Sequence, residues 1–295
     1  MTISCVFMGG LGNQLFQFFT TFAYSMRTFR RCVFPYSEEL HIGKTRPTYW
    51  HSLLKDMLHM TTFEKSNTGN IRQYSNNDLE NFPVYRENGF KYTEIPKFQQ
   101  DDVRFYGYFQ SYKYFKKDFV KICALLKLHD QKIQLMTEYP EYDFTYIHSI
   151  SMHFRLGDYK ENQPHHPIMP YQYYENALNC ILENRDVEFD QITVYYFCEK
   201  EDNDEVNKTI MQLQTKFLGL EFVKVQDDLE DWKQMLLMSL CNDNIIANSS
   251  FSWWGAYFNV NPDKIVCYPS LWFGDKIMNE NVDDLFPDSW EKIVF

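Results

Sequence analysis

The second half of the chain alternates between short apolar segments and longer segments with helical periodicity, and this pattern constrains the fold most. Short apolar runs are typical of buried strands, and apolar residues that recur every three or four positions are typical of amphipathic helices. The predicted strands are 147–154, 192–197, 221–225, 244–247 and 264–268, and the predicted helices are 171–184, 204–218, 229–241 and 252–258. Strands that alternate with helices in this way form a parallel α/β sheet.

The first residues predict a second unit of the same kind. Residues 3–8 are apolar, a glycine-rich loop follows, residues 14–30 have helical periodicity, and 31–34 form a short strand that Pro35 ends. Such a β-α-β opening places ligands at the carboxyl ends of its strands. Between 37 and 144 the periodicity is poor, with helix-like patches at 50–60 and 115–127 and an aromatic stretch at 105–115.

A domain boundary is expected near 139–144, where Pro140 and a cluster of Glu, Tyr and Asp separate the irregular half from the regular one. We therefore predict an α/β protein with two Rossmann-like domains, 1–143 and 144–295, that face a cleft.

Composition narrows the classes of partner. The 295 residues carry 29 Lys and Arg against 40 Asp and Glu, a net charge of −11, which disfavours binding to nucleic acid or to an anionic membrane. The aromatic share of 18% is high for a core alone and suits a protein that also lines clefts with rings.

The cysteines and the start of the chain predict a soluble, cytoplasmic protein. Seven cysteines, an odd number without C-x-x-C spacing, indicate reduced buried thiols and a reducing compartment. Neither a signal peptide nor a membrane-spanning run is visible, so the glycosylation sequons at Asn207 and Asn248 are read as chance matches.

The glycine-rich loop is the first candidate site. Gly10 and Gly12 match the start of a dinucleotide-binding G-x-G-x-x-G, but Leu15 replaces the third glycine and no acid ends the second strand, which disfavours an NAD site. Glycines still permit close backbone approach, and a helix N-terminus can bind an anion or a sugar hydroxyl. The alternative is a tight turn in which Asn13 is the helix N-cap.

Residues 153–159, HFRLGDY, end an apolar strand and form the second candidate. Strand alternation places His153 and Arg155 on one face. The planar guanidinium fits a phosphate bidentately, so Arg155 is a candidate phosphate clamp. The alternative is a structural salt bridge from Arg155 to Asp158 across the turn.

Residues 244–256, NIIANSSFSWWGA, form the third candidate. An apolar strand runs into amide and hydroxyl residues that can cap the next helix, which predicts a second phosphate cradle. Trp253 and Trp254 fall inside that helix and are expected in the core.

An alternative interpretation is a metal site at an Asp-x-Asp motif. Asp202 and Asp204 have the D-x-D spacing with which metal-dependent sugar transferases hold a cation, although acids before a helix are more often caps and favourable dipole charges. His165 and His166 are interpreted as loop residues, because adjacent side chains rarely ligate one metal and no ligand set surrounds them.

Four segments together resemble glycosyltransferase family 11, the α-1,2-fucosyltransferases. They are residues 9–17 (GGLGNQLFQ), 107–115 (GYFQSYKYF), 153–159 and 248–256 (NSSFSWWGA), which occur in the family's order and cover nearly the whole chain. The resemblance implies a GT-B type fold and a metal-independent, inverting transfer of L-fucose from GDP-β-L-fucose to the 2-hydroxyl of a galactose-containing acceptor. No cofactor is implied.

The resemblance also implies roles for the candidate residues. Arg155 would hold the donor diphosphate and stabilise the leaving GDP, while His153 and Asp158 would shape that site. The implied substrate-binding residues are Gly10, Gly12, Asn13, Asn248, Ser249, Ser250, Phe251 and Ser252. The domain 144–295 would bind the donor and 1–143 the acceptor, with Asn13 facing both across the cleft and the loops of 37–110 shaping the acceptor pocket.

One segment departs from the family pattern. Residues 197–201 read FCEKE where the family carries a Phe-Ser-Asp-Asp-like segment whose carboxylate reads the guanine edge, so Glu199 or, alternatively, Glu201 is a candidate substitute. The membrane anchor of human-type relatives is missing, and soluble bacterial or viral enzymes are the better comparison.

Several alternatives stay open. A non-catalytic protein that binds a GDP-sugar or a glycan could have the same cradle, and so could a transferase with another nucleotide sugar. The sequence does not identify a general base: His153, Asp158 and Glu161 are candidates, as is any carboxylate of the N-terminal half.

Overall fold

The computed structural model describes residues 1–63, 73–142, 144, 147–185 and 191–295, and the chain divides into two units. Unit 1 comprises Met1–Gln131 and Glu280–Pro287, and unit 2 comprises Lys132–Asn279 and Asp288–Phe295. The division falls inside helix α4 (Leu128–Glu138), upstream of the boundary predicted between 143 and 144, because this helix continues from one unit into the other. Residue 143 itself lies outside the described residues.

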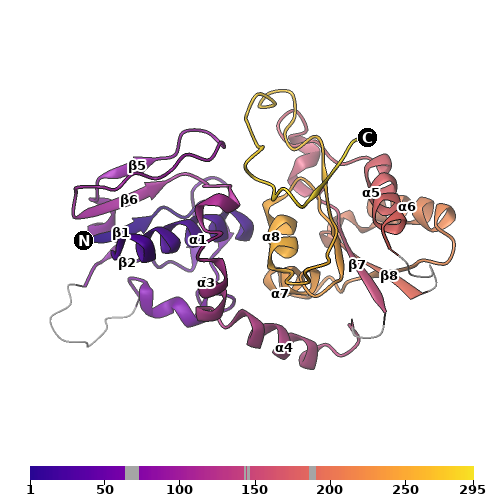
Figure 1. The fold of residues 1–295 in the computed structure, drawn as a ribbon, viewed down its shortest axis with the longest axis horizontal. Coiled ribbons are helices and arrows are strands. Elements are labelled where there is room, and N and C mark those ends of the chain that lie inside the picture. Colours follow the sequence, from indigo (N-terminus) through magenta and orange to yellow (C-terminus); the bar gives the residue numbers. More distant parts are fainter. Residues whose placement is uncertain (64–72, 143, 145–146, 186–190) are drawn as a thin grey trace. The chain divides into compact units, whose positions relative to one another are not determined.

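Unit 1 contains a four-stranded parallel sheet in the order β2-β1-β6-β5 (Figure 1). Its strands are β1 (Thr2–Cys5), β2 (Arg31–Cys32), β5 (Val84–Arg86) and β6 (Asp102–Tyr106). The helices are α1 (Leu11–Thr28), α2 (Asn76–Glu80) and α3 (Phe119–Leu125), with 3₁₀ helices η1 (Lys55–Met60) and η2 (Tyr112–Tyr114). A separate antiparallel pair is formed by β3 (Glu39–Leu40) and β4 (Arg46–Pro47). The predicted β-α-β opening is confirmed, since β1 and β2 are parallel neighbours joined by α1.

Helix α1 is buried on nearly every side, and aromatic side chains fill the core around it. The ring of Phe18 packs on that of Phe34 at 4.9 Å between centroids, and Phe19 packs on Phe115 at 5.5 Å. Because a helix that is apolar all round must be enclosed by other elements, these rings place α1 at the centre of unit 1. Much of the high aromatic content therefore belongs to this core.

Unit 2 contains a six-stranded parallel sheet in the order β12-β11-β10-β7-β8-β9. The strands are β7 (His148–His153), β8 (Ile192–Phe197), β9 (Glu221–Lys224), β10 (Asp243–Ile245), β11 (Val266–Pro269) and β12 (Glu291–Ile293). Counted from β7, this is the order 3-2-1-4-5-6 of a doubly wound Rossmann sheet read from its far edge, and the order reverses between β7 and β10.

Helices cover both faces of the unit 2 sheet. Figure 1 shows α5 (Tyr171–Glu183) and α6 (Asn203–Lys216) on one side of it, and α7 (Asp231–Met238) and α8 (Ser250–Phe258) on the other. Short 3₁₀ helices η3 (Gly157–Glu161) and η5 (Lys200–Asp202) follow β7 and β8. Apolar side chains such as Leu178 of α5 and Ile210 of α6 pack on Val194 of β8 in a core cluster.

These observations confirm the predicted α/β class. Each strand and helix predicted between 147 and 268 is present with its ends within a few residues, and β12 is an additional strand. The two Rossmann-like units are the parts of the predicted GT-B type fold. Trp253 and Trp254 are completely buried in α8, as predicted.

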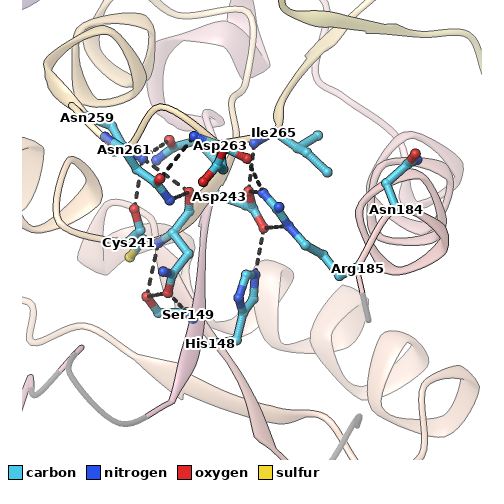
Figure 2. A network of polar contacts seen from close by, with 12 residues as sticks. His148, Ser149, Asn184, Arg185, Cys241, Asp243, Asn259, Asn261, Asp263 and Ile265 are labelled. Atoms are coloured by element: carbon cyan, nitrogen blue, oxygen red, sulfur yellow. Dashed lines mark hydrogen bonds and ion pairs between the residues drawn. The ribbon is translucent and has the colours of Figure 1, made fainter. Parts of the chain in front are cut away.

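A buried polar network fastens the amino-terminal ends of the unit 2 strands (Figure 2). Asp243, the first residue of β10, is completely buried; its carboxylate lies 2.6 Å from Nε2 of His148 at the start of β7, and it accepts from Nε of Arg185 at 3.0 Å. The backbone N–H of Ile265 donates to it at 2.6 Å. The same two strands, β7 and β10, carry candidate site residues at their opposite ends.

All seven cysteines lie within the described residues and are free thiols, five of them buried and Cys123 and Cys180 half-buried. Burial raises the pKa of the Cys5 thiol to about 12. Among the described helices, none combines the length and the apolar character that crossing a membrane requires.

Candidate active site

Three candidate segments meet at the carboxyl edge of the unit 2 sheet. Strands β10, β7 and β8 are neighbours, and the segments 246–252, 154–161 and 198–202 follow them. Ligands of open parallel sheets bind at this edge, where the strand order reverses. The topology thus unites three sequence patterns that lie up to about a hundred residues apart in the chain.

Arg155 follows β7 and brings a guanidinium to this edge. Its guanidinium forms ion pairs with Asp158 and with Glu199, and its Cζ lies 4.9 Å from the ring centroid of Tyr159. The side chain is 15% exposed, whereas those of Asp158 and Glu199 are 44% and 49% exposed. The salt bridge to Asp158 considered from the sequence is therefore present, and Glu199 is a second partner of Arg155.

The turn after Arg155 requires glycine. Gly157 has φ of +40°, and a Cβ there would lie 2.7 Å from Oε2 of Glu199 and 3.1 Å from Nη1 of Arg155. Its N–H donates to Oδ2 of Asp202 at 2.8 Å. Gly157 thereby lets the chain pass close to the ion pair.

Asp202 braces this turn. It is 2% exposed, and its second oxygen pairs with Nζ of Lys160 at 2.8 Å. Asp204 is exposed in the first turn of α6. Within the described part of the chain, no group of three or more His, Cys, Asp and Glu side chains is arranged to hold a metal ion.

The N-terminus of α8 adds hydrogen-bond donors to the same edge. The helix begins at Ser250, two residues before the predicted start, because the Ser249 hydroxyl caps it by accepting from the N–H of Phe251 at 3.3 Å. Unpaired N–H groups and the helix dipole make such an end favourable for an anion. Ser249 and Ser252 are buried, while Ser250 and Phe251 are partly exposed.

Two lysines bind the opposite end of α8. Nζ of Lys264 donates to the carbonyls of Ala256 at 2.7 Å and Asn259 at 2.5 Å, and Nζ of buried Lys132 donates to Phe258 at 2.7 Å. Burial and the neighbouring Lys132 lower the pKa of Lys264 to about 8. Cations at a helix C-terminus complement its dipole, so they stabilise the element that presents the donors.

His153 and Asn248 bring buried polar atoms without partners to this edge. His153 is 7% exposed, its ring packs on that of Phe251 at 5.5 Å, and its Nδ1 has no hydrogen-bond partner among the described residues. Asn248 is 2% exposed; its Nδ2 donates to Pro167 at 2.9 Å and to Trp272 at 3.2 Å, but its Oδ1 has no partner in the described structure. A ligand that reaches these two atoms could complete their hydrogen bonding, so both are candidate contacts.

The titration of His153 limits its chemistry. Burial, with a smaller effect of the Arg155 charge, lowers the pKa of His153 to about 3. A histidine that is neutral at pH 7 and binds protons this weakly is poorly matched to general-base catalysis. His153 can instead offer a neutral ring nitrogen to a ligand.

The glycine-rich loop lies at the carboxyl edge of the unit 1 sheet, after β1. Helix α1 begins at Leu11 with Gly10 as its N-cap, so the interpretation of Asn13 as N-cap is wrong: it lies in the first turn. Gly12 is buried in the same turn. Oδ1 of Asn13 accepts from Nε2 of Gln110 at 2.8 Å.

Four features of the site are not predicted from the sequence: Gln110, Tyr159, Lys160 and the contacts by which Asp202 supports the turn. Tyr159 donates to the carbonyl of Asn248 at 3.2 Å, and the His166 ring stacks on Tyr159 at 4.8 Å. Gln110 and Tyr159 lie inside segments that carry the family resemblance, which was the available signal.

A Rossmann-type sheet whose carboxyl edge presents a guanidinium and a helix N-terminus is typical of enzymes that bind nucleotides. The match to a family model identifies the reaction type of this nucleotide-binding fold: the protein is a glycosyltransferase. It belongs to glycosyl transferase family 11, whose sequence model matches residues 7–294.

Two relatives from Escherichia coli are similar to this chain. The O-antigen biosynthesis glycosyltransferase WbnK is 27% identical over 319 residues, with 97% of this chain and 98% of the relative covered. An alpha-1,2-colitosyltransferase is 27% identical over 194 residues, with 65% of this chain and 62% of the relative covered.

Two solved structures of fucosyltransferases are more distant. A mutant of FUT1 from Arabidopsis thaliana, in complex with GDP, is 13% identical with a TM-score of 0.44, covering 88% of this chain and 68% of that one. The alpha-1,6-fucosyltransferase NodZ soaked with GDP-fucose is 11% identical with a TM-score of 0.44, covering 86% and 90%.

Proposed function

We propose that this glycosyltransferase transfers L-fucose from GDP-β-L-fucose to the 2-hydroxyl of a galactose-containing glycan in an α-1,2 linkage. The observation that carries the assignment of a nucleotide diphosphate donor is the array of Arg155, the α8 N-terminus and the unpartnered Nδ1 of His153 at one sheet edge, while GDP and L-fucose are supported by the family resemblance. The linkage is supported by the family resemblance and by the similarity to an alpha-1,2-colitosyltransferase.

The proposed reaction breaks the bond between C1 of fucose and the diphosphate oxygen. The acceptor oxygen forms the new bond to C1 from the opposite face and loses its proton, so a β-linked donor gives an α-linked product. Negative charge grows on the leaving GDP, and preorganised donors at that point lower the barrier most. Arg155 with the donors of 248–252 supplies this stabilisation without a metal or a cofactor.

Individual residues have defined proposed roles. Arg155 contacts the diphosphate, while Asp158 and Glu199 hold its guanidinium before the donor binds. The serines 249, 250 and 252 offer hydroxyl donors to the phosphates, and the unpartnered Oδ1 of Asn248 offers an acceptor to a hydroxyl or N–H of the donor. His153 and Phe251 form the wall beside them. Gly10, Gly12 and Asn13 belong to unit 1, for which we propose acceptor binding.

Glu199 has two proposed roles: it holds the Arg155 guanidinium, or it reads the guanine edge. Its carboxylate cannot do both at the same moment, and it could read the guanine edge only after the diphosphate has displaced it from Arg155. The contact with Arg155 favours the first role. A donor other than GDP-fucose would fit the same phosphate site, because the contacts to the phosphates do not distinguish the sugar.

The test is transfer itself. The purified protein, given GDP-fucose and a panel of β-galactosides, should yield a product whose proton NMR spectrum contains an α-anomeric fucose linked to the galactose 2-oxygen. Product formed only from a different nucleotide sugar would replace the donor assignment. Tight GDP-fucose binding without any product across the panel would favour a binding protein. A cytoplasmic location, which we also propose, would place the enzyme where nucleotide sugars are available.

A further inference from the structure

Glu87 holds a tight loop at the carboxyl edge of the unit 1 sheet. It follows β5, and its N–H donates to the carbonyl of Tyr106 at 2.9 Å, which extends the pairing with β6. Its Oε2 accepts from the N–H of Phe109 at 2.7 Å. A carboxylate that accepts backbone N–H groups forms charge-assisted bonds stronger than neutral ones, so Glu87 can fix the conformation of residues 107–111.

The loop 107–111 is tightly packed and has a strained backbone. A Cβ on Gly107 would lie 2.4 Å from Cβ of Glu87 and 2.6 Å from its Oε2, so the approach requires glycine. Phe109 has φ of +52°, a left-handed conformation that costs a residue with a side chain about 1 kcal/mol or more. Its ring is completely buried and packs on those of Phe105 and Tyr114, each at 5.5 Å. Strain held this firmly by its surroundings is typical of functional sites.

The loop orients a proposed substrate-binding residue. Gln110, the residue after Phe109, is 8% exposed and donates from Nε2 to Oδ1 of Asn13 at 2.8 Å. Beside Asn13, Gly10 has an extended conformation that any residue adopts, and nothing lies within 4 Å of where its Cβ would be. Neither backbone nor packing calls for glycine at position 10, so the space is consistent with a ligand that approaches the backbone.

We propose that Glu87 is a positioning residue for acceptor binding: it fixes the 107–111 loop so that Gln110 sets the direction of the Asn13 amide toward the acceptor sugar. The inference rests on the proposed function, since it assigns the acceptor to this edge of unit 1. Glu87 acts through Phe109 and Gln110 and is not itself a catalytic residue.

Ionisation of Glu87 gives this role a pH signature. Burial raises the pKa of Glu87 to about 7, although the N–H groups of Phe109 and Tyr108 and the Tyr114 hydroxyl oppose the shift. Among the described residues, the titratable groups that interact with it electrostatically are Tyr114 of η2 and Tyr85 of β5, while Tyr108 contributes its backbone N–H. Tyrosines stay neutral near pH 7, so the change in this range belongs to Glu87. The ionised form holds the loop best, and acceptor kcat/KM should fall as the pH drops below 7.

Three variants of the full chain test the proposal. Glu87→Ala removes the acceptor of the Phe109 N–H, and we expect the KM for the acceptor to rise on the order of tenfold while GDP affinity is unchanged. Glu87→Gln keeps an oxygen for that N–H and cannot ionise. It should therefore retain most of the activity, and its acceptor kcat/KM should no longer fall as the pH drops below 7. Glu183→Gln, the same substitution at an exposed site at the end of α5, should behave as the wild type.

Hydrogen exchange of the amides of 108–111 provides a readout independent of activity. We expect faster exchange in Glu87→Ala than in the wild type and rescue in Glu87→Gln at pH 8. Unchanged loop exchange and unchanged acceptor KM in Glu87→Ala would overturn the proposal, as would a fall in acceptor kcat/KM below pH 7 that persists in Glu87→Gln. If no variant transfers fucose, the proposed function fails by itself, and the effect of Glu87→Ala on exchange still decides whether Glu87 fixes the loop.

Discussion

Arg155 and Glu199 lie at the carboxyl ends of the adjacent strands β7 and β8, and their side chains form an ion pair beside the N-terminus of α8. Both of the carboxylates that contact Arg155 are close to half exposed, whereas the guanidinium is mostly buried. A diphosphate could therefore replace the carboxylates on Arg155 without moving the arginine.

Replacement of Glu199 by glutamine should strengthen GDP binding severalfold. The substitution removes a negative charge that competes with the diphosphate for Arg155. In a larger fraction of the free protein the Arg155 guanidinium is then available to GDP. Isothermal titration with GDP and ADP measures the effect, and Asp228→Asn is a control at an exposed site. Weaker GDP binding together with a smaller preference for GDP over ADP would assign Glu199 to the guanine edge instead.

His153 should make the fold less stable in acid. Unfolded histidine binds a proton below pH 6.5, whereas burial keeps His153 neutral in the folded protein down to about pH 3. The unfolded chain thus binds more protons within this window, and the free energy of unfolding falls as the pH drops from 6.5 toward 3. Urea unfolding of wild type and His153→Phe from pH 7 to pH 4 should show a shallower fall in the variant. If the free energy of unfolding fell equally with pH in both proteins, the lowered pKa of His153 would be contradicted.

Asp243→Asn should destabilise unit 2 by roughly 3 kcal/mol, because it removes the charge of a completely buried carboxylate that the half-buried Arg185 and His148 contact (Figure 2). Burial raises the pKa of Asp243, but hydrogen bonds from His148 and Arg185 outweigh this and hold the pKa below its ordinary value. The stabilisation is therefore present above about pH 4 and is lost as the pH falls further.

Chemical denaturation at pH 7 and pH 3 checks this prediction, with Asp228→Asn as the control. The network lies at the sheet edge opposite the candidate site, so the folded variant should keep the kcat of the wild type. A variant as stable as the wild type at pH 7 would show that the network contributes no net stability.

The regular half of the fold could be predicted from sequence because its strands are continuous apolar runs. Each of β7 and β8 is buried along nearly its whole length, which is the pattern of a central parallel strand. Strand β12 was not predicted because only Ile293 of its three residues is buried. Strand β5 was not predicted because both of its ends are exposed. Edge strands of this kind leave too few apolar positions to show a period.

Residues of the candidate site could be predicted where a charged or polar side chain directly follows an apolar strand. Arg155, Asn248 and Ser249 met that condition. The partnership of Glu199 with Arg155 spans 44 residues, and that of Glu87 with Phe109 spans 22, so both depend on which strands become neighbours. The alternative in which Asn13 is the helix N-cap failed because Gly10 ends the loop earlier and α1 starts at Leu11.

The most direct test of the central claim is acceptor-dependent GDP release from GDP-fucose in the presence of EDTA, measured for the wild type and for Arg155→Ala. The variant should fold, since its lost ion pairs involve exposed carboxylates and are worth about 1 kcal/mol or less each. We predict release that depends on a β-galactoside, survives EDTA, and falls on the order of 10²- to 10³-fold in kcat when Arg155 is removed. A folded Arg155→Ala protein that turns over like the wild type, or an activity that EDTA abolishes and Mn²⁺ restores, would contradict the account.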